Sequence, residues 1–208
     1  MHMEYLDKGH QGIIYTNSER NIIIKISNKN KVSKETNWLK KLNKYNLGPK
    51  LISARDEYLM MEHINGKRIL DYIKCADKTE ILRLIKEVMA QCRILDKLKV
   101  NKAEMHHPVK HILVNKKVTL IDFERCHRTK NPKNVTQFCH FILSNEKILL
   151  EKDINIGKNE FIRLVKNYKH NQTEKNFSLL LRFFLSFYKN TLPKTFKKSV
   201  NHTLIQPR

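Results

Sequence analysis

The sequence has little glycine, proline, cysteine or tryptophan: five, five, four and one, respectively, among 208 residues. No Gly/Ser-rich linker is present, so we expect one compact domain or two small lobes around a cleft. The cysteines show no C-x-x-C spacing, which excludes a disulfide framework and predicts reduced thiols. The Cys-His pairs at 126–127 and 139–140 are adjacent in sequence, so their side chains tend to diverge and disfavour a zinc site.

Long apolar segments are also missing. The chain begins in a charged, mixed segment without the apolar region of a signal peptide. The longest apolar stretch, Phe177 to Tyr188, is interrupted by Arg182 and is much shorter than the roughly 20 residues that span a bilayer. We therefore expect a buried helix there, no membrane association and a cytoplasmic location.

Acidic residues are scarce relative to basic ones. The chain has 41 lysines and arginines against 20 aspartates and glutamates, a net charge of +21. Such an excess predicts a positive field that attracts polyanions, although a solvated lysine-rich surface gives the same composition. Residues 156–208 contribute eleven basic and two acidic residues. The charge therefore favours RNA or a ribonucleoprotein as a partner.

The first third of the chain is expected to form strands. Short β-branched runs alternate with turn residues, a pattern typical of an antiparallel meander. We expect a helix after the third strand, capped by Ser33, running to about Tyr45 and terminated by Gly48-Pro49. The expected strands are Met3–Lys8, Ile13–Tyr15, Asn21–Ile26, Leu51–Ile52 and Tyr58–Met61.

The remainder of the chain is expected to be mainly helical, which makes the fold class α+β. Asp77-x-x-Glu80 has the pattern of an N-terminal capping box, and the helix that it opens runs to about Lys97. Its apolar residues recur with helical spacing, which predicts a core helix. Further helices are expected at Arg68–Lys74, Val135–Leu143, Glu160–Tyr168 and Thr173–Lys189.

Three features of the strand-rich region are suited to a nucleotide. Gly9-x-x-Gly12 lies between the first two strands, where glycines let backbone N–H groups approach phosphate oxygens, although alone it is more typical of a hairpin turn. Lys25 is the only charge in an apolar strand; it either pairs with phosphates or points outward. Glu35 is expected in the first turn of the next helix, where an acidic side chain favours the helix dipole. A kinase-like site would pair it with Lys25, and otherwise it is solvated.

The segment 104–124 carries the most specific pattern. A loop leads into an apolar strand at Ile112–Val114, a two-residue turn at Lys116-Lys117 and a second strand at Val118–Ile121. This second strand ends at Asp122. A carboxylate there is costly unless it meets a cation, so we expect Asp122 to bind Mg²⁺.

The order of these parts resembles the protein kinase-like fold over roughly residues 3–145. The chain looks most similar to the small atypical kinases of archaea, near the RIO kinases and the kinase associated with the tRNA threonylcarbamoyladenosine complex. Within that group it resembles the predicted archaeal serine/threonine kinases. Glu104, Lys110-His111 and Asp122-Phe123-Glu124 match that family's pattern.

The resemblance implies a single bilobal domain that binds ATP and Mg²⁺. A five-stranded antiparallel N-lobe with one helix would cover about 1–62, a short mainly helical C-lobe about 67–192 and a basic tail about 193–208. The residues implied to contact the nucleotide are Gly9, Gly12, Lys25, Glu35 and, at the hinge, Glu62. Those implied to hold metal are Asp122 and His111, and those implied to act in catalysis are Glu104, Lys110 and His111.

Two positions depart from the common kinase loop. His111 stands where that loop has a metal-binding asparagine, and imidazole is a poor Mg²⁺ ligand. Either one metal is then enough, or Glu124 helps to hold the second. His106 stands where the loop has its aspartate. Glu104 lies seven residues before His111 instead of five, and a loop turning at Pro108 would bring its carboxylate to the substrate hydroxyl. The general base is therefore Glu104 or His106.

The expected function is transfer of the γ-phosphoryl group of ATP to a serine or threonine of a protein substrate. The departures at His111 and Glu104 favour an alternative, a pseudokinase or nucleotide-sensing basic module that docks on RNA or a translation-related complex. A small-molecule kinase of the aminoglycoside type shares the fold but usually has an acidic substrate pocket, which this basic chain does not obviously supply.

Overall fold

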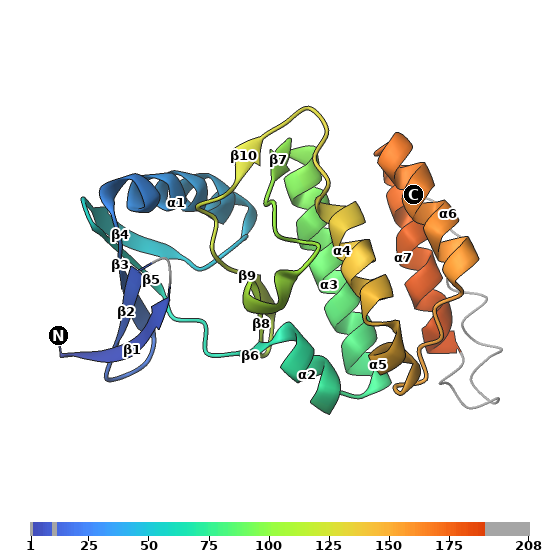
Figure 1. Ribbon diagram of the computed structural model, residues 1–208, viewed down its shortest axis with the longest axis horizontal. Coiled ribbons are helices and arrows are strands. Elements are labelled where there is room, and N and C mark those ends of the chain that lie inside the picture. Colours follow the sequence, from blue (N-terminus) through green and yellow to red (C-terminus); the bar gives the residue numbers. More distant parts are fainter. Residues whose placement is uncertain (1, 10–11, 190–208) are drawn as a thin grey trace, which may run out of the picture.

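The computed structural model describes residues 2–9 and 12–189 (Figure 1). Residues 10–11 of the glycine loop, and the basic segment expected at 193–208, lie outside the described residues. A β-sheet with one helix lies at one end of the molecule and a group of helices at the other. The segments that hold the candidate functional residues run between these two parts.

The sheet is antiparallel and five-stranded, with the order β1-β2-β3-β5-β4. Its presence beside seven α-helices in the described part of the chain confirms the predicted α+β class. The register places Lys25 opposite Ile14 on one side and Leu59 on the other, so Lys25 lies inside the sheet. The strands are β1 (Met3–Gly9), β2 (Gly12–Asn17), β3 (Ile22–Ile26), β4 (Leu51–Arg55) and β5 (Tyr58–Glu62).

Gly12 has a structural reason to be glycine. It pairs with Gly9 where β1 meets β2, and its φ is +143°, in a region that L side chains rarely adopt. A Cβ atom at this position would lie 2.0 Å from the carbonyl oxygen of Ile26 on β3. The close approach of two backbones therefore requires glycine here, whether or not a phosphate binds.

Helix α1 (Lys29–Leu42) begins earlier than expected. The prediction that Ser33 caps it is wrong, because the Asn28 side chain accepts a hydrogen bond from the Lys31 backbone N–H. The observed cap, Asn28, lies five residues before Ser33. Glu35 consequently lies in the second turn, where it is buried. The expectation of a helix-start residue at Glu35 is therefore corrected.

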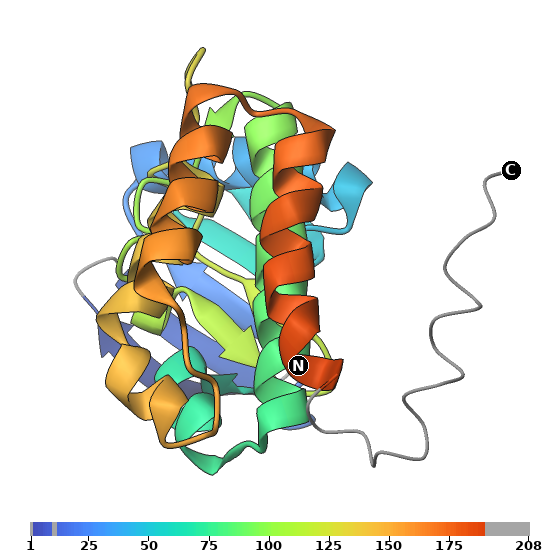
Figure 2. The ribbon, with the colours of Figure 1, turned by 90° about the vertical axis from the view of Figure 1, so that its right-hand side faces the viewer.

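The helical part is built around α3 (Lys78–Lys97). The predicted capping box is confirmed, since the Asp77 side chain accepts from the Glu80 N–H and the Glu80 side chain from the Asp77 N–H. Helix α7 packs against α3, and α6 lies beside α7 and packs against α4 (Figure 2). The other helices are α2 (Ile69–Cys75), α4 (Asn134–Ser144), α5 (Glu146–Leu150), α6 (Lys158–His170) and α7 (Glu174–Lys189); the sequence did not predict α5.

Helix α7 corrects the expectation of a fully buried helix. Its Phe177, Leu180 and Phe184 are buried against the core, whereas Leu179 and Leu185 are 37% and 41% exposed. An amphipathic helix on the surface of the helical part has this pattern. Within residues 2–9 and 12–189, no helix has the length and apolar character needed to cross a membrane.

Short strands connect the two parts of the molecule. The hairpin β8–β9 pairs Val114 with Val118, so its connection has three residues and the predicted two-residue turn is wrong. Asn115 closes the loop, because its side chain accepts from the Lys117 N–H at 3.0 Å. These elements are β6 (Lys67–Arg68), β7 (Val100–Asn101), β8 (Ile112–Val114), β9 (Val118–Leu120) and β10 (His127–Arg128), with 3₁₀ turns η1 (Asn43–Tyr45) and η2 (Pro108–Lys110).

Candidate functional site

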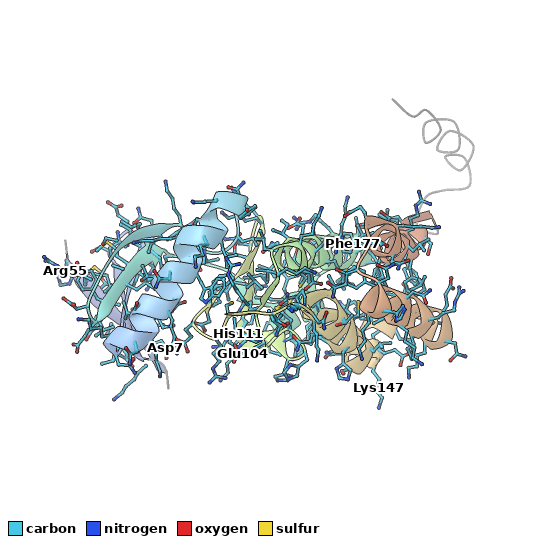
Figure 3. The ribbon with its side chains drawn as sticks, turned by 90° about the horizontal axis from the view of Figure 1, so that it is seen from above. Asp7, Arg55, Glu104, His111, Lys147 and Phe177 are labelled. Atoms are coloured by element: carbon cyan, nitrogen blue, oxygen red, sulfur yellow. The ribbon has the colours of Figure 1, made fainter. Side chains whose placement is uncertain are left out.

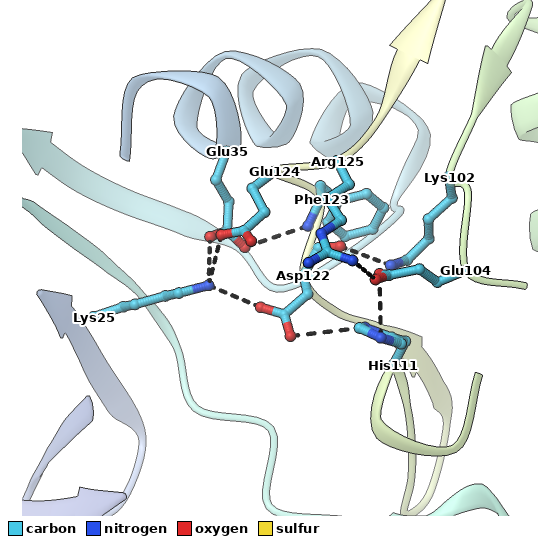
Figure 4. Close-up of polar contacts among 9 residues, drawn as sticks. All are labelled: Lys25, Glu35, Lys102, Glu104, His111, Asp122, Phe123, Glu124 and Arg125. Atoms are coloured by element: carbon cyan, nitrogen blue, oxygen red, sulfur yellow. Dashed lines mark hydrogen bonds and ion pairs between the residues drawn. The ribbon is translucent and has the colours of Figure 1, made fainter. Parts of the chain in front are cut away.

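Lys25 meets three carboxylates that come from distant parts of the sequence (Figure 4). Its Nζ lies 2.8 Å from Glu35 Oε2, 2.8 Å from Asp122 Oδ1 and 3.5 Å from Glu124 Oε2. The expected pairing of Lys25 with Glu35 is present, and the outward-pointing alternative for Lys25 is excluded, since its side chain is 5% exposed. The sheet, α1 and the segment after β9 therefore converge on one ammonium group.

Burial and charge act on these groups in opposite directions. Burial opposes protonation of Lys25, but the Glu35 and Asp122 carboxylates outweigh it and raise the pKa of Lys25 above its usual value. Burial would raise the pKa of Asp122, but Lys25 lowers it below its usual value. At Glu35 burial is the larger effect, and its pKa is raised. Lys25 and Asp122 are therefore both charged at neutral pH.

Asp122 has an unusual backbone conformation. Its φ is +60°, in the left-handed region that aspartate tolerates better than most residues, and β9 ends two residues earlier at Leu120. The Nζ of Lys102 donates to the Asp122 carbonyl oxygen at 2.7 Å. Contacts from two lysines thus hold the carboxylate and the carbonyl of Asp122 in place, and such conformations are concentrated at functional sites.

Lys102 belongs to the site although the sequence did not point to it. It is fully buried, burial lowers its pKa, and its Nζ lies 5.1 Å above the centre of the Phe123 ring. Its backbone N–H donates to the Asn134 side chain, which in turn donates to Asp96 at 2.7 Å. Lys102 lies two residues before the candidate catalytic acid Glu104, but this position in the sequence does not show that it is buried.

Phe123 connects the site to α1. Its backbone N–H donates to Glu35 Oε1 at 3.4 Å, and its ring is fully buried. Gly48, with φ +79°, allows this packing, because a Cβ there would lie 2.7 Å from the ring. The helix that supplies Glu35 and the segment that supplies Asp122 are therefore joined by both a hydrogen bond and a packed ring.

Glu104 and His111 form the other half of the site, between the sheet and the helical part (Figure 3). Glu104 Oε2 lies 3.1 Å from His111 Nε2, and its Oε1 accepts from Arg125 Nη1 at 2.8 Å. His111 Nδ1 is buried without a hydrogen-bond partner, 3.7 Å from Asp122 Oδ2. The loop around Pro108 therefore brings Glu104 and His111 to the same place as Asp122.

The protonation of His111 follows from its surroundings. Burial and the Lys102 ammonium lower the pKa of His111, and Glu104 and Asp122 only partly oppose them, so the ring is neutral at pH 7. We assign its proton to Nε2, which faces the Glu104 carboxylate. The lone pair of Nδ1 then faces the carboxylate of Asp122, which leaves this gap suited to a cation or a water molecule.

Three further residues expected from the sequence, Glu62, Lys110 and His106, take no part in the contacts around Lys25 and Glu104. Glu62, at the end of β5, accepts from the Lys50 N–H and lies 3.6 Å from Lys117 Nζ, so it connects the sheet to the β8–β9 hairpin. Lys110 is exposed on η2 and takes no part in the contacts among the other site residues. His106 is exposed and takes no part in them either. We call the connected residues the charged cluster: Lys25, Glu35, Lys102, Glu104, His111, Asp122, Glu124 and Arg125.

The charged cluster could hold Mg²⁺ only together with the phosphates of a nucleotide. In the described part of the chain, no group of three or more His, Cys, Asp or Glu side chains is arranged to hold a metal ion by itself. Mg²⁺ is usually bound by one or two carboxylates together with substrate phosphates and water. The Asp122 carboxylate, whose side chain is 32% exposed, and the nearby Glu124 supply oxygen donors of this kind.

Comparison with known proteins finds a likeness over half of the chain. No protein-family model matches the sequence. A segment of 114 residues is 28% identical to the uncharacterized protein MJ1211 of Methanocaldococcus jannaschii. The match covers 52% of this chain and 98% of that relative. The name of the relative assigns no activity, so the function has to be argued from the charged cluster.

Proposed function

We propose that this protein is a minimal protein kinase-like enzyme that transfers the γ-phosphoryl group of ATP to a serine or threonine hydroxyl. The observation that carries the proposal is the position of Lys25, 2.8 Å from both Glu35 and Asp122. Protein kinases require a strand lysine paired with a helix glutamate, and an aspartate that binds Mg²⁺ at the phosphates. The strand order and the glycines at 9 and 12 are compatible with this assignment.

The nucleotide phosphates would bind at Lys25. Phosphoryl transfer depends mainly on positioning and on charges fixed in advance. Glu35 holds Lys25, whose raised pKa keeps it cationic for the α- and β-phosphates. Mg²⁺, when bound with the nucleotide, would neutralise charge that develops on the transferred group. Asp122 would hold it, with Glu124 or His111 Nδ1 as the second donor, and Gly9, Gly12 and Glu62 would contact the rest of the nucleotide.

Glu104 is our candidate for the group that orients the substrate hydroxyl. Protein kinases carry an aspartate as the third residue of His-Arg-Asp in the catalytic loop. Here the acid of Lys102-Ala103-Glu104 lies two residues before the aspartate position, which His106 occupies, and Lys102 contacts the Asp122 carbonyl. Arg125 and His111 fix the Glu104 carboxylate at 2.8 and 3.1 Å. Lys110, exposed beside this loop, would approach the γ-phosphate only after substrate binds.

The same contacts favour a second candidate, a pseudokinase that binds nucleotide without transferring phosphate. Both oxygens of Glu104 are engaged, by Arg125 and by His111, which leaves this acid less available as a base. His111 also supplies nitrogen where Mg²⁺ prefers oxygen. The two candidates share nucleotide binding at Lys25 and Asp122, and they differ only in whether phosphate leaves the nucleotide.

Two measurements on the full chain distinguish the candidates. Thermal unfolding with and without Mg-ATP reports binding, and transfer of radiolabelled γ-phosphate to the chain itself or to dephosphorylated casein reports chemistry. We expect Mg-ATP to stabilise the wild-type protein. We expect Asp122→Asn to lose both this stabilisation and transfer, and Glu104→Gln to lose transfer alone.

Two control variants repeat the same chemical changes, Asp→Asn and Glu→Gln, at exposed positions outside the charged cluster. Asp153 is an exposed aspartate with φ +57°, so Asp153→Asn repeats the chemical change at a similar backbone conformation. Glu57→Gln repeats the other change in the exposed turn between β4 and β5. Binding of Mg-ATP without any transfer would select the pseudokinase. Absence of binding by the wild-type protein would overturn both candidates.

A further inference from the structure

A groove on the helical part of the molecule is lined by basic side chains. It has a volume of about 580 Å³ and lies between the end of α3, the segment that joins β10 to α4, and the end of α6. These elements meet at the top of the view in Figure 1. We call it the basic groove, and its cationic side chains are Lys99, Lys130, Lys133, Lys166 and Lys169, with His170 beside them.

The ammonium groups of the basic groove are free for a ligand. All five lysines are exposed, and none forms an ion pair with a carboxylate of the described residues. No acidic residue lines the groove. Glu174, which begins α7, is held by Arg93 at 3.3 Å and Lys97 at 3.4 Å. Five positive charges are therefore gathered without a partner, and a bound polyanion would relieve their mutual repulsion.

The walls of the groove are fixed by contacts that do not use the lysine ammonium groups. Gln172, in the α6–α7 turn, donates to the Pro132 carbonyl oxygen at 2.7 Å and joins the two sides. The Thr129 N–H donates to the Lys99 carbonyl oxygen at 3.0 Å, and the Lys133 N–H donates to the Asn101 side chain at 2.9 Å. The lysines are thus carried by a preformed frame, which lowers the entropic cost of binding.

The basic surface continues along α6. A second hollow, of about 330 Å³, shares Lys166 with the groove and includes Arg163 and Asn159 one and two turns earlier. From Asn159 to His170 the helix rises about 16 Å at 1.5 Å per residue. The continuous surface is therefore long enough to meet several successive phosphates of a nucleic-acid strand.

We propose that the basic groove binds the sugar-phosphate backbone of double-helical RNA, independently of the phosphoryl transfer proposed above. Lysine ammonium groups neutralise phosphates and release counterions, which gives affinity without sequence readout. The groove is lined by no aromatic residue. A site for single strands stacks bases on aromatic side chains, so the lining fits a duplex whose bases stay paired.

The amide side chains favour RNA over DNA. Asn131 and Asn171 line the groove, and their side-chain amides form no hydrogen bond within the described residues. An amide both donates and accepts, as does the ribose 2′-hydroxyl, which the wide minor groove of an RNA duplex exposes. The groove thus offers ammonium groups for the phosphates and free amides for the ribose hydroxyls.

The test compares two full-length variants with equal loss of charge. The groove variant carries Lys→Gln at positions 99, 130, 133, 166 and 169. The control variant carries Lys→Gln at 34, 40, 44, 86 and 147, five exposed lysines outside the groove and the charged cluster. Fluorescence anisotropy measures binding of a labelled 20-base-pair RNA duplex of mixed sequence from 50 to 300 mM salt. Circular dichroism verifies that both variants fold.

We expect the groove variant to lose about 100-fold in affinity at 150 mM salt, with a plot of log K against log salt less steep by about 3 to 4. The control variant should lose less than about threefold, because only diffuse attraction is reduced. Equal loss in both variants would overturn the proposal. Equal or tighter binding of duplex DNA, of single-stranded RNA or of polyglutamate, with the same dependence on the groove lysines, would also overturn it.

Discussion

The charged cluster and the basic groove use lysine in opposite ways. Lys25 and Lys102 are buried, and each contacts a carboxylate or a carbonyl at 2.7 to 2.8 Å. The groove lysines are exposed and have no carboxylate partner among the described residues. A buried ammonium must be compensated inside the protein, whereas an exposed one is compensated by water until a polyanion binds. The surroundings of a lysine therefore indicate whether it positions internal groups or recruits a partner.

The net charge of the protein does not show this difference between the charged cluster and the basic groove. The whole chain carries +21, yet the charged cluster brings four carboxylates to two lysines and one arginine. Acid and base are nearly balanced there, as the proposed binding of Mg²⁺ and nucleotide phosphates requires. The excess lies elsewhere, including the groove. The comparison predicts that changes in the cluster alter stability and chemistry, and that changes in the groove alter salt-dependent binding only.

The largest effect is expected from Asp122→Asn. The amide cannot replace the charge that would hold Mg²⁺, so we expect phosphoryl transfer to fall by at least about 100-fold. Radiolabelled transfer measures this loss, with Asp153→Asn as the matched control. RNA affinity of Asp122→Asn should remain within about twofold of the wild-type value. A parallel loss of RNA binding would show that cluster and groove are one site.

Removal of the buried ammonium should cost stability as well as nucleotide binding. Lys25→Met leaves Glu35 and Glu124 buried without their cation, and we expect the free energy of unfolding to fall by about 3 kcal/mol. Urea denaturation measures it. Lys29→Met is the control, because Lys29 forms an exposed ion pair with Asp56 and should change stability by less than about 1 kcal/mol. Similar values for the two variants would contradict the assigned role of Lys25.

Substitutions of Lys102 and Lys99 compare a buried lysine of the charged cluster with an exposed lysine of the basic groove. Lys102→Met retains a long side chain over Phe123 but leaves the Asp122 carbonyl without its donor, so we expect a loss of about 1 to 3 kcal/mol. Transfer should fall while the KM for ATP changes little, because Lys102 contacts the Asp122 carbonyl and we assign the phosphates to Lys25. Lys99→Met, three residues earlier in the groove, should leave stability unchanged and reduce the salt dependence of RNA binding.

The smallest effect is expected from alkaline pH. The pKa of Lys25 is raised in the folded state, so its stabilising contribution is complete below the unfolded-state pKa of about 10.4 and is lost as pH rises through the folded-state pKa. The difference in unfolding free energy between the wild-type protein and Lys25→Met should be constant from pH 7 to 9. It should shrink by about 1 kcal/mol at pH 11. A difference that grows with pH would contradict the raised pKa.

The sequence was most informative about features that depend only on neighbouring residues. The capping box at Asp77 and Glu80 was predicted because it is local, and the meander followed from β-branched runs between turns. The start of α1 differs from the prediction, because Asn28 and Ser33 are both good caps and the sequence alone does not distinguish them. Lys102 was missed because nothing in its neighbours shows that it is buried.

By itself, the sequence determined the α+β order of elements, the excess of positive charge and the candidates Lys25, Glu35, Glu104, His111 and Asp122. The order of elements and the charge depend on composition and on periodicity along the chain, whereas the candidate residues depend on the resemblance to the protein kinase-like fold. Only the tertiary structure decided that these side chains meet around one ammonium, that Lys102 supports Asp122, and that lysines from three separate segments line one groove. Contacts between distant segments depend on packing, and burial determines which charges must be paired and which remain free.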